Sequence, residues 1–99
     1  MYAVVRELRY DPDKLTDAAG QLEEFQRLHA AQPGYLGSLT VDAGEGRRVV
    51  VNLWETEAQA FAGRDALEPA VRQLVAPLLT EPSQLLGAGP VIENDLVRT

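Results

Sequence analysis

The chain has 99 residues, no cysteine and a formal net charge of -6, from nine Lys and Arg residues against fifteen Asp and Glu residues. That charge repels phosphate backbones and anionic lipid headgroups, so we expect neither nucleic acid nor a membrane as a partner. The lack of cysteine excludes disulfides, thiolate metal ligands and cysteine nucleophiles. We expect a single domain over residues 1–99 and, because no signal peptide is recognisable, a cytoplasmic location.

A strand is predicted over residues 2–10, where apolar and polar side chains alternate. One face carries Tyr2, Val4, Leu8 and Tyr10. Arg6 interrupts that apolar face, and two interpretations are open. Its guanidinium can stabilise a phenolate or enolate as negative charge develops, or it can lie at a sheet rim or dimer interface, paired with an acid. The second is the expected one, because arginines are seldom buried without a partner.

A helix is predicted to follow, with Asp11 as N-cap and Pro12 at the first helical position, and to end at Pro33-Gly34. Its apolar stripe consists of Leu15, Ala18, Leu22, Phe25 and His29. His29 lies in the last turn, where an imidazole can act as general base towards a phenolic substrate. The alternative is a structural histidine at the edge of the core or at the negative end of the helix dipole.

Two further strands are predicted over residues 35–42 and 49–54, joined by a turn at residues 43–46. In the first of them, Tyr35, Leu39 and Val41 are expected on one face. In the second, Val50, Asn52 and Trp54 share one face, and Val49, Val51 and Leu53 share the other. A buried amide beside a large ring is typical of a small-molecule pocket. The alternative is a Trp54 packed under a helix, with Asn52 bonded to backbone.

A second helical region begins at Thr56, which with Gln59 forms a capping-box pattern. A short helix with Ala58, Phe61 and Ala62 is expected first, then a kink or break near residues 65–68 caused by Pro69. The continuation carries Leu67, Val71, Leu74, Val75 and Leu78. A last extended segment is predicted over residues 85–97, with a bulge or bend at residues 87–90.

The resulting order, β-α-β-β-α-β, indicates an α+β protein with the ferredoxin-like fold, in which two helices cover one face of a four-stranded antiparallel sheet. No cluster of His, Asp and Glu has metal-ligand spacing, and the chain has a single His. We therefore expect neither a metal nor a cofactor.

The sequence resembles the antibiotic biosynthesis monooxygenase-like (ABM) domains of the dimeric α/β-barrel superfamily. The resemblance rests on residues 32–37, Gln-Pro-Gly-Tyr-Leu-Gly, on residues 50–55, Val-Val-Asn-Leu-Trp-Glu, and on residues 76–79, Ala-Pro-Leu-Leu. It implies a homodimer whose two sheets pack face to face as a barrel, with a pocket in each subunit between sheet and helices. Some such domains oxidise polyketide-like phenols with dioxygen and no cofactor, and others degrade haem.

Within this resemblance, Trp54 matches the strand tryptophan of the enzymes, and Asn52 can take the role of their pocket asparagine. The haem degraders resemble one another in a histidine on the helix after that tryptophan, where this chain has Arg64. They also carry an asparagine on the first strand, where residues 5–8 read Val-Arg-Glu-Leu. The resemblance therefore does not predict haem degradation here.

The favoured hypothesis is a cofactor-independent monooxygenase that acts on a small phenolic or polyketide-like aromatic. Its candidate catalytic residues are His29, Asn52, Trp54 and Arg6. Its candidate substrate-binding residues are Asn52, Trp54, Phe25, Phe61 and Arg64, although a solvent-facing position is the expected alternative for Arg64 and for Arg72. The other hypotheses are a non-catalytic dimeric module for ligand binding or assembly and, less favoured, an isomerase or lyase that uses His29.

Overall fold

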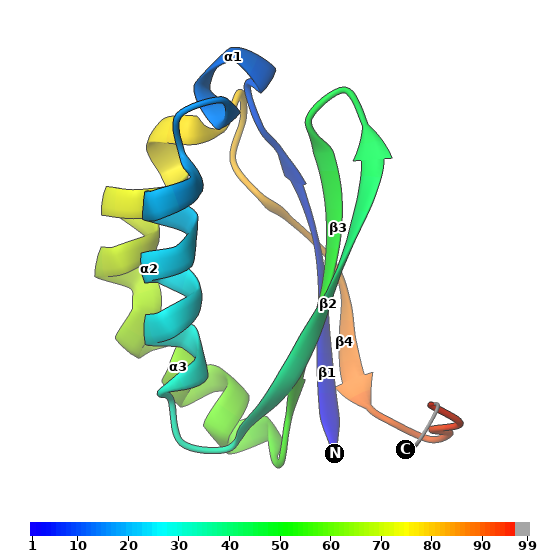
Figure 1. Ribbon diagram of the computed structural model, residues 1–99. Coiled ribbons are helices and arrows are strands. Elements are labelled where there is room, and N and C mark those ends of the chain that lie inside the picture. The colour runs from blue at the N-terminus through cyan, green and yellow to red at the C-terminus, as the bar shows by residue number, and fades with distance from the viewer. Residues whose placement is uncertain (97–99) are drawn as a thin grey trace.

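The computed structural model describes residues 1–96. Its elements are β1 (Tyr2–Arg9), α1 (Pro12–Leu15), α2 (Ala19–Ala30), β2 (Tyr35–Gly44), β3 (Arg47–Trp54), α3 (Glu57–Ala70), a π-helical turn (Val71–Val75), a 3₁₀ turn (Ala76–Leu78) and β4 (Gln84–Pro90). The strands form one antiparallel sheet in the order β2-β3-β1-β4, and the helices cover one of its faces (Figure 1). The predicted ferredoxin-like fold is confirmed.

The first helical region begins as predicted but is interrupted. The side chain of Asp11 accepts a hydrogen bond from the backbone N–H of Asp13 (2.9 Å), so Asp11 is the N-cap of α1. The helix then ends at Leu15, and α2 starts only at Ala19, so the prediction of one continuous helix is wrong. Thr16 and Asp17 at the break are poor helix formers because their side chains compete for backbone hydrogen bonds.

The second helical region is more continuous than predicted. The expected break near residues 65–68 is wrong, because α3 continues through Pro69 to Ala70. The irregularity comes one turn later, in the π-helical turn. Thr56 accepts a hydrogen bond from the N–H of Gln59 (3.2 Å), as the capping-box pattern predicts. The buried side of α3 is formed by Ala60, Gly63 and Leu67.

Two edge strands depart from simple alternation. A bulge between Tyr35 and Gly37 shifts the register of β2, so Tyr35 faces the helices while Leu39 and Val41 face the other way. The prediction that these three side chains share a face is therefore wrong. In β4 the register shift lies at Leu86, just before the predicted residues 87–90, and the strand ends at Pro90. Val97 of the predicted last segment lies outside the described residues.

The apolar interior consists of two clusters under the helices. The first core cluster contains Tyr10, Ala18, Val75 and Leu78, with aliphatic neighbours such as Leu8, Leu15 and Leu22. The second core cluster contains Tyr2, Trp54 and Ala60, with Val4 and Tyr35 packed against it. The first lies near α1 and the second at the opposite end of the sheet, and members of both line the cavity described below.

The other face of the sheet, here called the open face, is not covered by helices (Figure 1). Val49, Val51 and Leu53 lie on it as predicted, opposite Glu7, Val5 and Ala3 of β1. Leu39 and Val41 of the neighbouring strand are 53% and 55% exposed. The open face is therefore largely apolar and accessible in the single chain.

Candidate functional site

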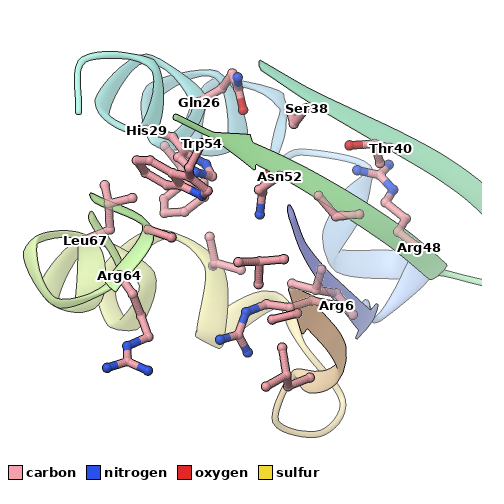
Figure 2. A pocket seen from close by; sticks show the side chains of 18 of the residues that line it. Arg6, Gln26, His29, Ser38, Thr40, Arg48, Asn52, Trp54, Arg64 and Leu67 are labelled. Carbon is pink, nitrogen blue, oxygen red and sulfur yellow. The ribbon is translucent and has the colours of Figure 1, made fainter. Parts of the chain in front are cut away.

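A cavity of about 280 Å³ lies between the sheet and the helices α2 and α3. Every residue predicted for the site contributes to its lining: Arg6, Phe25, His29, Asn52, Trp54, Phe61 and Arg64. Ligand pockets are typically apolar with few polar groups and start at about 300 Å³, so this cavity suits a small ligand. The apolar side chains of α2 and α3 line the space without filling it (Figure 2).

Asn52 points from the centre of β3 into the cavity (Figure 2). Its Oδ1 atom is buried and has no hydrogen-bond partner among the described residues. An unmade hydrogen bond of a buried acceptor costs about 1–3 kcal/mol, and such atoms are rare in folded proteins. The Asn52 amide therefore has unused hydrogen-bonding capacity at the wall of the cavity.

His29 is enclosed by aromatic rings. Its ring centroid lies 4.7 Å from that of Tyr35 and 5.6 Å from those of Trp54 and Phe25. His29 is 7% exposed and Trp54 is 3% exposed. Burial lowers the pKa of the His29 imidazole below its ordinary value of 6.5, so the ring is neutral at pH 7. A neutral imidazole at the wall of the cavity can accept a proton.

The ring of Tyr35 belongs to this aromatic group, and its hydroxyl takes part in two hydrogen bonds that the sequence did not indicate. Gln26 donates a hydrogen bond to the Tyr35 hydroxyl (3.1 Å), which donates one to the Ser38 hydroxyl (3.0 Å). The Tyr35 ring meets Trp54 edge-on at 5.6 Å. Gln26 and Ser38 also line the cavity. The β2 bulge turns Tyr35 towards the helices, and no sequence pattern located that bulge.

Gly63 positions Trp54 from the opposite side. A Cβ atom at position 63 would overlap the indole ring, so only glycine allows α3 to approach Trp54 this closely. Sequence analysis missed this contact, because a glycine inside a helix does not indicate which ring it touches. Trp54 is therefore held between Gly63 of α3 and the rings of His29 and Tyr35.

Among residues 1–96, three arginines line the cavity, and no acidic residue does. Arg48 lies over the Tyr10 ring (5.1 Å) and Arg64 over the Phe61 ring (5.2 Å). Sequence analysis did not select Arg48, although it alternates in phase with Val50, Asn52 and Trp54 and that spacing could have identified it. Arg72, by contrast, forms an ion pair with Glu68 on an exposed part of the helical layer and does not line the cavity.

Two other kinds of site find no support in residues 1–96. No three side chains from His, Cys, Asp and Glu are grouped there to hold a metal ion. No helix in the same range is long and apolar enough to cross a membrane.

Residues 1–73 match the family model described as antibiotic biosynthesis monooxygenase. The chain belongs to this family. The ABM resemblance seen in the sequence is thereby confirmed, whereas no curated protein sequence matches.

Solved structures show the same fold at low sequence identity. NE2512, a protein of unknown function from Nitrosomonas europaea, has a TM-score of 0.77 and 19% identity, with 99% of this chain and 95% of that chain covered. Rv0793 from Mycobacterium tuberculosis has a TM-score of 0.72 and 18% identity over 96% and 98% of the two chains. A mutant of SnoaB, a cofactor-independent oxygenase from Streptomyces nogalater, has a TM-score of 0.72 and 14% identity over 94% of each chain.

Proposed function

We propose that this ABM-family protein is a cofactor-independent monooxygenase that oxidises a small phenolic or polyketide-like aromatic in the cavity of Asn52 and Trp54. The observation that carries the proposal is the buried Asn52 Oδ1 atom, which has no partner among the described residues. A phenol O–H is a donor attached to an apolar ring, so it fits both this acceptor and the aromatic wall around it. Family membership and the structural similarity to SnoaB, a cofactor-independent oxygenase, support the oxygenase chemistry.

In this account the aromatic ring of the substrate lies against Trp54, Phe25 and Phe61. Aromatic contacts of this kind favour offset or edge-on packing, for which the cavity walls provide several faces. The substrate hydroxyl donates to Asn52 Oδ1, which fixes the ring relative to His29. To lose its proton the hydroxyl turns from Asn52 Oδ1 to His29, and the Nδ2–H group of Asn52 and the positive charge of the cavity lining then stabilise the anion that forms.

His29 accepts that proton. Its lowered pKa keeps it neutral and ready to act as a base, and the imidazolium that forms is stabilised by the phenolate beside it. The proton transfer leaves an electron-rich ring against the apolar walls of the cavity. Such a ring can donate electrons to dioxygen without a cofactor, since the substrate itself is the reductant.

The reaction balances without a further reagent. A carbon of the ring anion forms a bond to dioxygen, which takes two electrons and one proton to give a hydroperoxide. Loss of water from that carbon breaks the O–O bond and its remaining C–H bond, and leaves a carbonyl. One oxygen atom enters the product and the other becomes water, so 1-naphthol would give 1,4-naphthoquinone.

The test is dioxygen uptake with 1-naphthol and 1,8-dihydroxyanthrone. We expect uptake with the wild type, a large loss in His29→Gln and Asn52→Ala, and no change in Arg72→Gln, whose side chain lies outside the cavity. Binding without uptake would favour the non-catalytic ligand-binding module, and proton exchange into the substrate without uptake would favour an isomerase. If neither compound binds, the cavity assignment is wrong.

The proposal includes a homodimer formed through the open face. The apolar side chains there, Val49, Val51, Leu53, Leu39 and Val41, are half-buried or exposed in the single chain. Contiguous exposed apolar surface of this kind favours association, and a second copy would cover it with the same residues. Light scattering should give twice the chain mass for the wild type and the single chain mass for Val51→Lys. A monomeric wild type would contradict the dimer without affecting the cavity.

A further inference from the structure

In the part of the chain that the structure describes, the cavity is lined by three arginines and no acid, although the full sequence carries a net charge of -6. Two of these arginines have partners, since Arg48 and Arg64 each lie over an aromatic ring and Arg64 also contacts Asp65 (3.3 Å). Arg6 differs from them. No carboxylate of residues 1–96 lies within ion-pair distance of its guanidinium.

The sheet places Arg6 among apolar neighbours. Its partners in register are Val50 on β3 and Leu85 on β4, and the side chain is half-buried. A cation held in such surroundings without an anion is unfavourable, and an anion that binds beside it removes that penalty. The guanidinium offers a fixed fork of donors that matches a carboxylate.

The spacing between Arg6 and Asn52 sets the size of a ligand that reaches both. Asn52 is opposite Val4 on β1, and Arg6 lies two residues further along that strand. Two residues of a strand span about 7 Å, which is comparable with the length of a bicyclic aromatic. Figure 2 shows the Arg6 guanidinium and the Asn52 amide at separate places along the cavity.

We infer that the substrate is a hydroxylated aromatic acid, with its hydroxyl at Asn52 and its carboxylate bound by Arg6 at the other end of the ring system. This inference rests on the function proposed above, because it assigns the substrate class of the same cavity. It gives Arg6 a substrate-binding role distinct from stabilising the phenolate. Binding of the carboxylate by Arg6 then determines which end of the ring system approaches His29.

The test compares 5-hydroxy-2-naphthoate with its neutral isostere 5-hydroxy-2-naphthamide by isothermal titration calorimetry. We expect the acid to bind the wild type at least about tenfold more tightly, as a charged hydrogen-bonded pair should give. Arg6→Gln should reduce that preference to about twofold or less, and Arg6→Lys should leave an intermediate preference, because the charge remains but the fork is lost. Arg72→Gln is the matched control, with the full preference expected.

Each outcome has a defined meaning. Equal affinity of the acid and the amide for the wild type overturns the inference and leaves the proposed function standing. Failure of both compounds to bind overturns the proposed function itself. A preference that survives Arg6→Gln overturns the assignment to Arg6. If circular dichroism shows that Arg6→Gln does not fold, an undiminished preference in Arg6→Lys overturns it instead.

Discussion

The two faces of the sheet differ in whether their buried polar groups have hydrogen-bond partners. On the open face, Glu7 is 7% exposed and its carboxylate accepts hydrogen bonds from Arg47 (3.0 Å) and Arg9 (2.8 Å). These two arginines lower the pKa of the Glu7 carboxyl, the Arg47 hydrogen bond being the largest contribution. On the helix-covered face, Asn52 Oδ1 is buried and has no partner within residues 1–96.

The difference separates structural polar groups from those available to a ligand. Glu7, Arg9 and Arg47 satisfy one another, and Arg9 also reaches Glu81 (3.1 Å), so this network needs nothing further. Asn52 and Arg6 line the cavity and have no comparable partners in the described chain. A small protein has little stability to spare, so unsatisfied groups of this kind are expected where function requires them.

The largest expected effect tests the chemistry of the helix-covered face. His29→Gln removes the proposed base while keeping a polar side chain of similar size, and we expect the rate of dioxygen uptake to fall about 100-fold to 10,000-fold. The measurement is kcat with 1-naphthol, with Arg72→Gln as control. An unchanged rate and pH profile would show that His29 is structural.

The next test substitutes the polar group on each face in turn. Asn52→Leu removes an unsatisfied acceptor, so we expect the free energy of unfolding to rise by about 1–2 kcal/mol while ligand binding weakens about tenfold or more. Glu7→Gln breaks a satisfied network and should lower the midpoint of thermal unfolding without changing ligand affinity. Urea and thermal unfolding measure the stability of each variant, and isothermal titration calorimetry measures its ligand affinity. If both substitutions stabilise the protein, or both destabilise it, the proposed difference between the two faces is wrong.

A further effect, on stability and fluorescence alone, is expected where Gly63 packs against Trp54. Gly63→Ala places a methyl group against the indole, so the ring must move or α3 must shift, at a cost of about 1–3 kcal/mol. Because Trp54 is the only tryptophan, its fluorescence reports the displacement directly. Gly20→Ala is the matched control, since a Cβ there contacts nothing. An unchanged spectrum in Gly63→Ala would contradict the packing described above.

The smallest effect concerns pH. The unfolded chain protonates His29 near its ordinary pKa of 6.5, but the folded chain does so only at lower pH, so the unfolded state binds more protons in between. The free energy of unfolding should therefore decrease as pH falls below about 6.5, and this decrease should be weaker in His29→Gln. Glu7 acts in a separate window: its lowered pKa gives stability that is lost only as pH falls below its ordinary value of 4.5. A pH series of urea unfolding curves distinguishes the two.

The sequence predicted the fold because its local signals agree with one another. The alternation in β1 and β3, the Asp11 cap and the Thr56 capping box all indicate the elements that the structure contains. The sequence could not predict where the side chains of β2 change faces, because the bulge that causes the change depends on how β2 pairs with β3. The continuity of α3 through Pro69 likewise depends on packing that local propensity does not describe.

The lining of the candidate cavity could be predicted in part. Strand alternation predicted that Asn52 and Trp54 share a face, and helical periodicity placed His29 on the apolar side of its helix. The structure places all three in the lining of one cavity. The contacts of Gln26, Ser38 and Gly63 could not be predicted, since each depends on which segments meet across the sheet and helices. The missing partner of Asn52 Oδ1 is also a property of the folded structure alone.

The central claim is that Asn52 Oδ1 is available to the hydroxyl of an aromatic ligand. The most direct measurement is the affinity of 1-naphthol and of 1-methoxynaphthalene, which lacks the O–H donor, for the wild type and for Asn52→Leu. We expect the wild type to bind the naphthol about tenfold or more tightly than the methyl ether, and Asn52→Leu to lose this preference. Equal affinities in the wild type, or a preference that persists in Asn52→Leu, would contradict it.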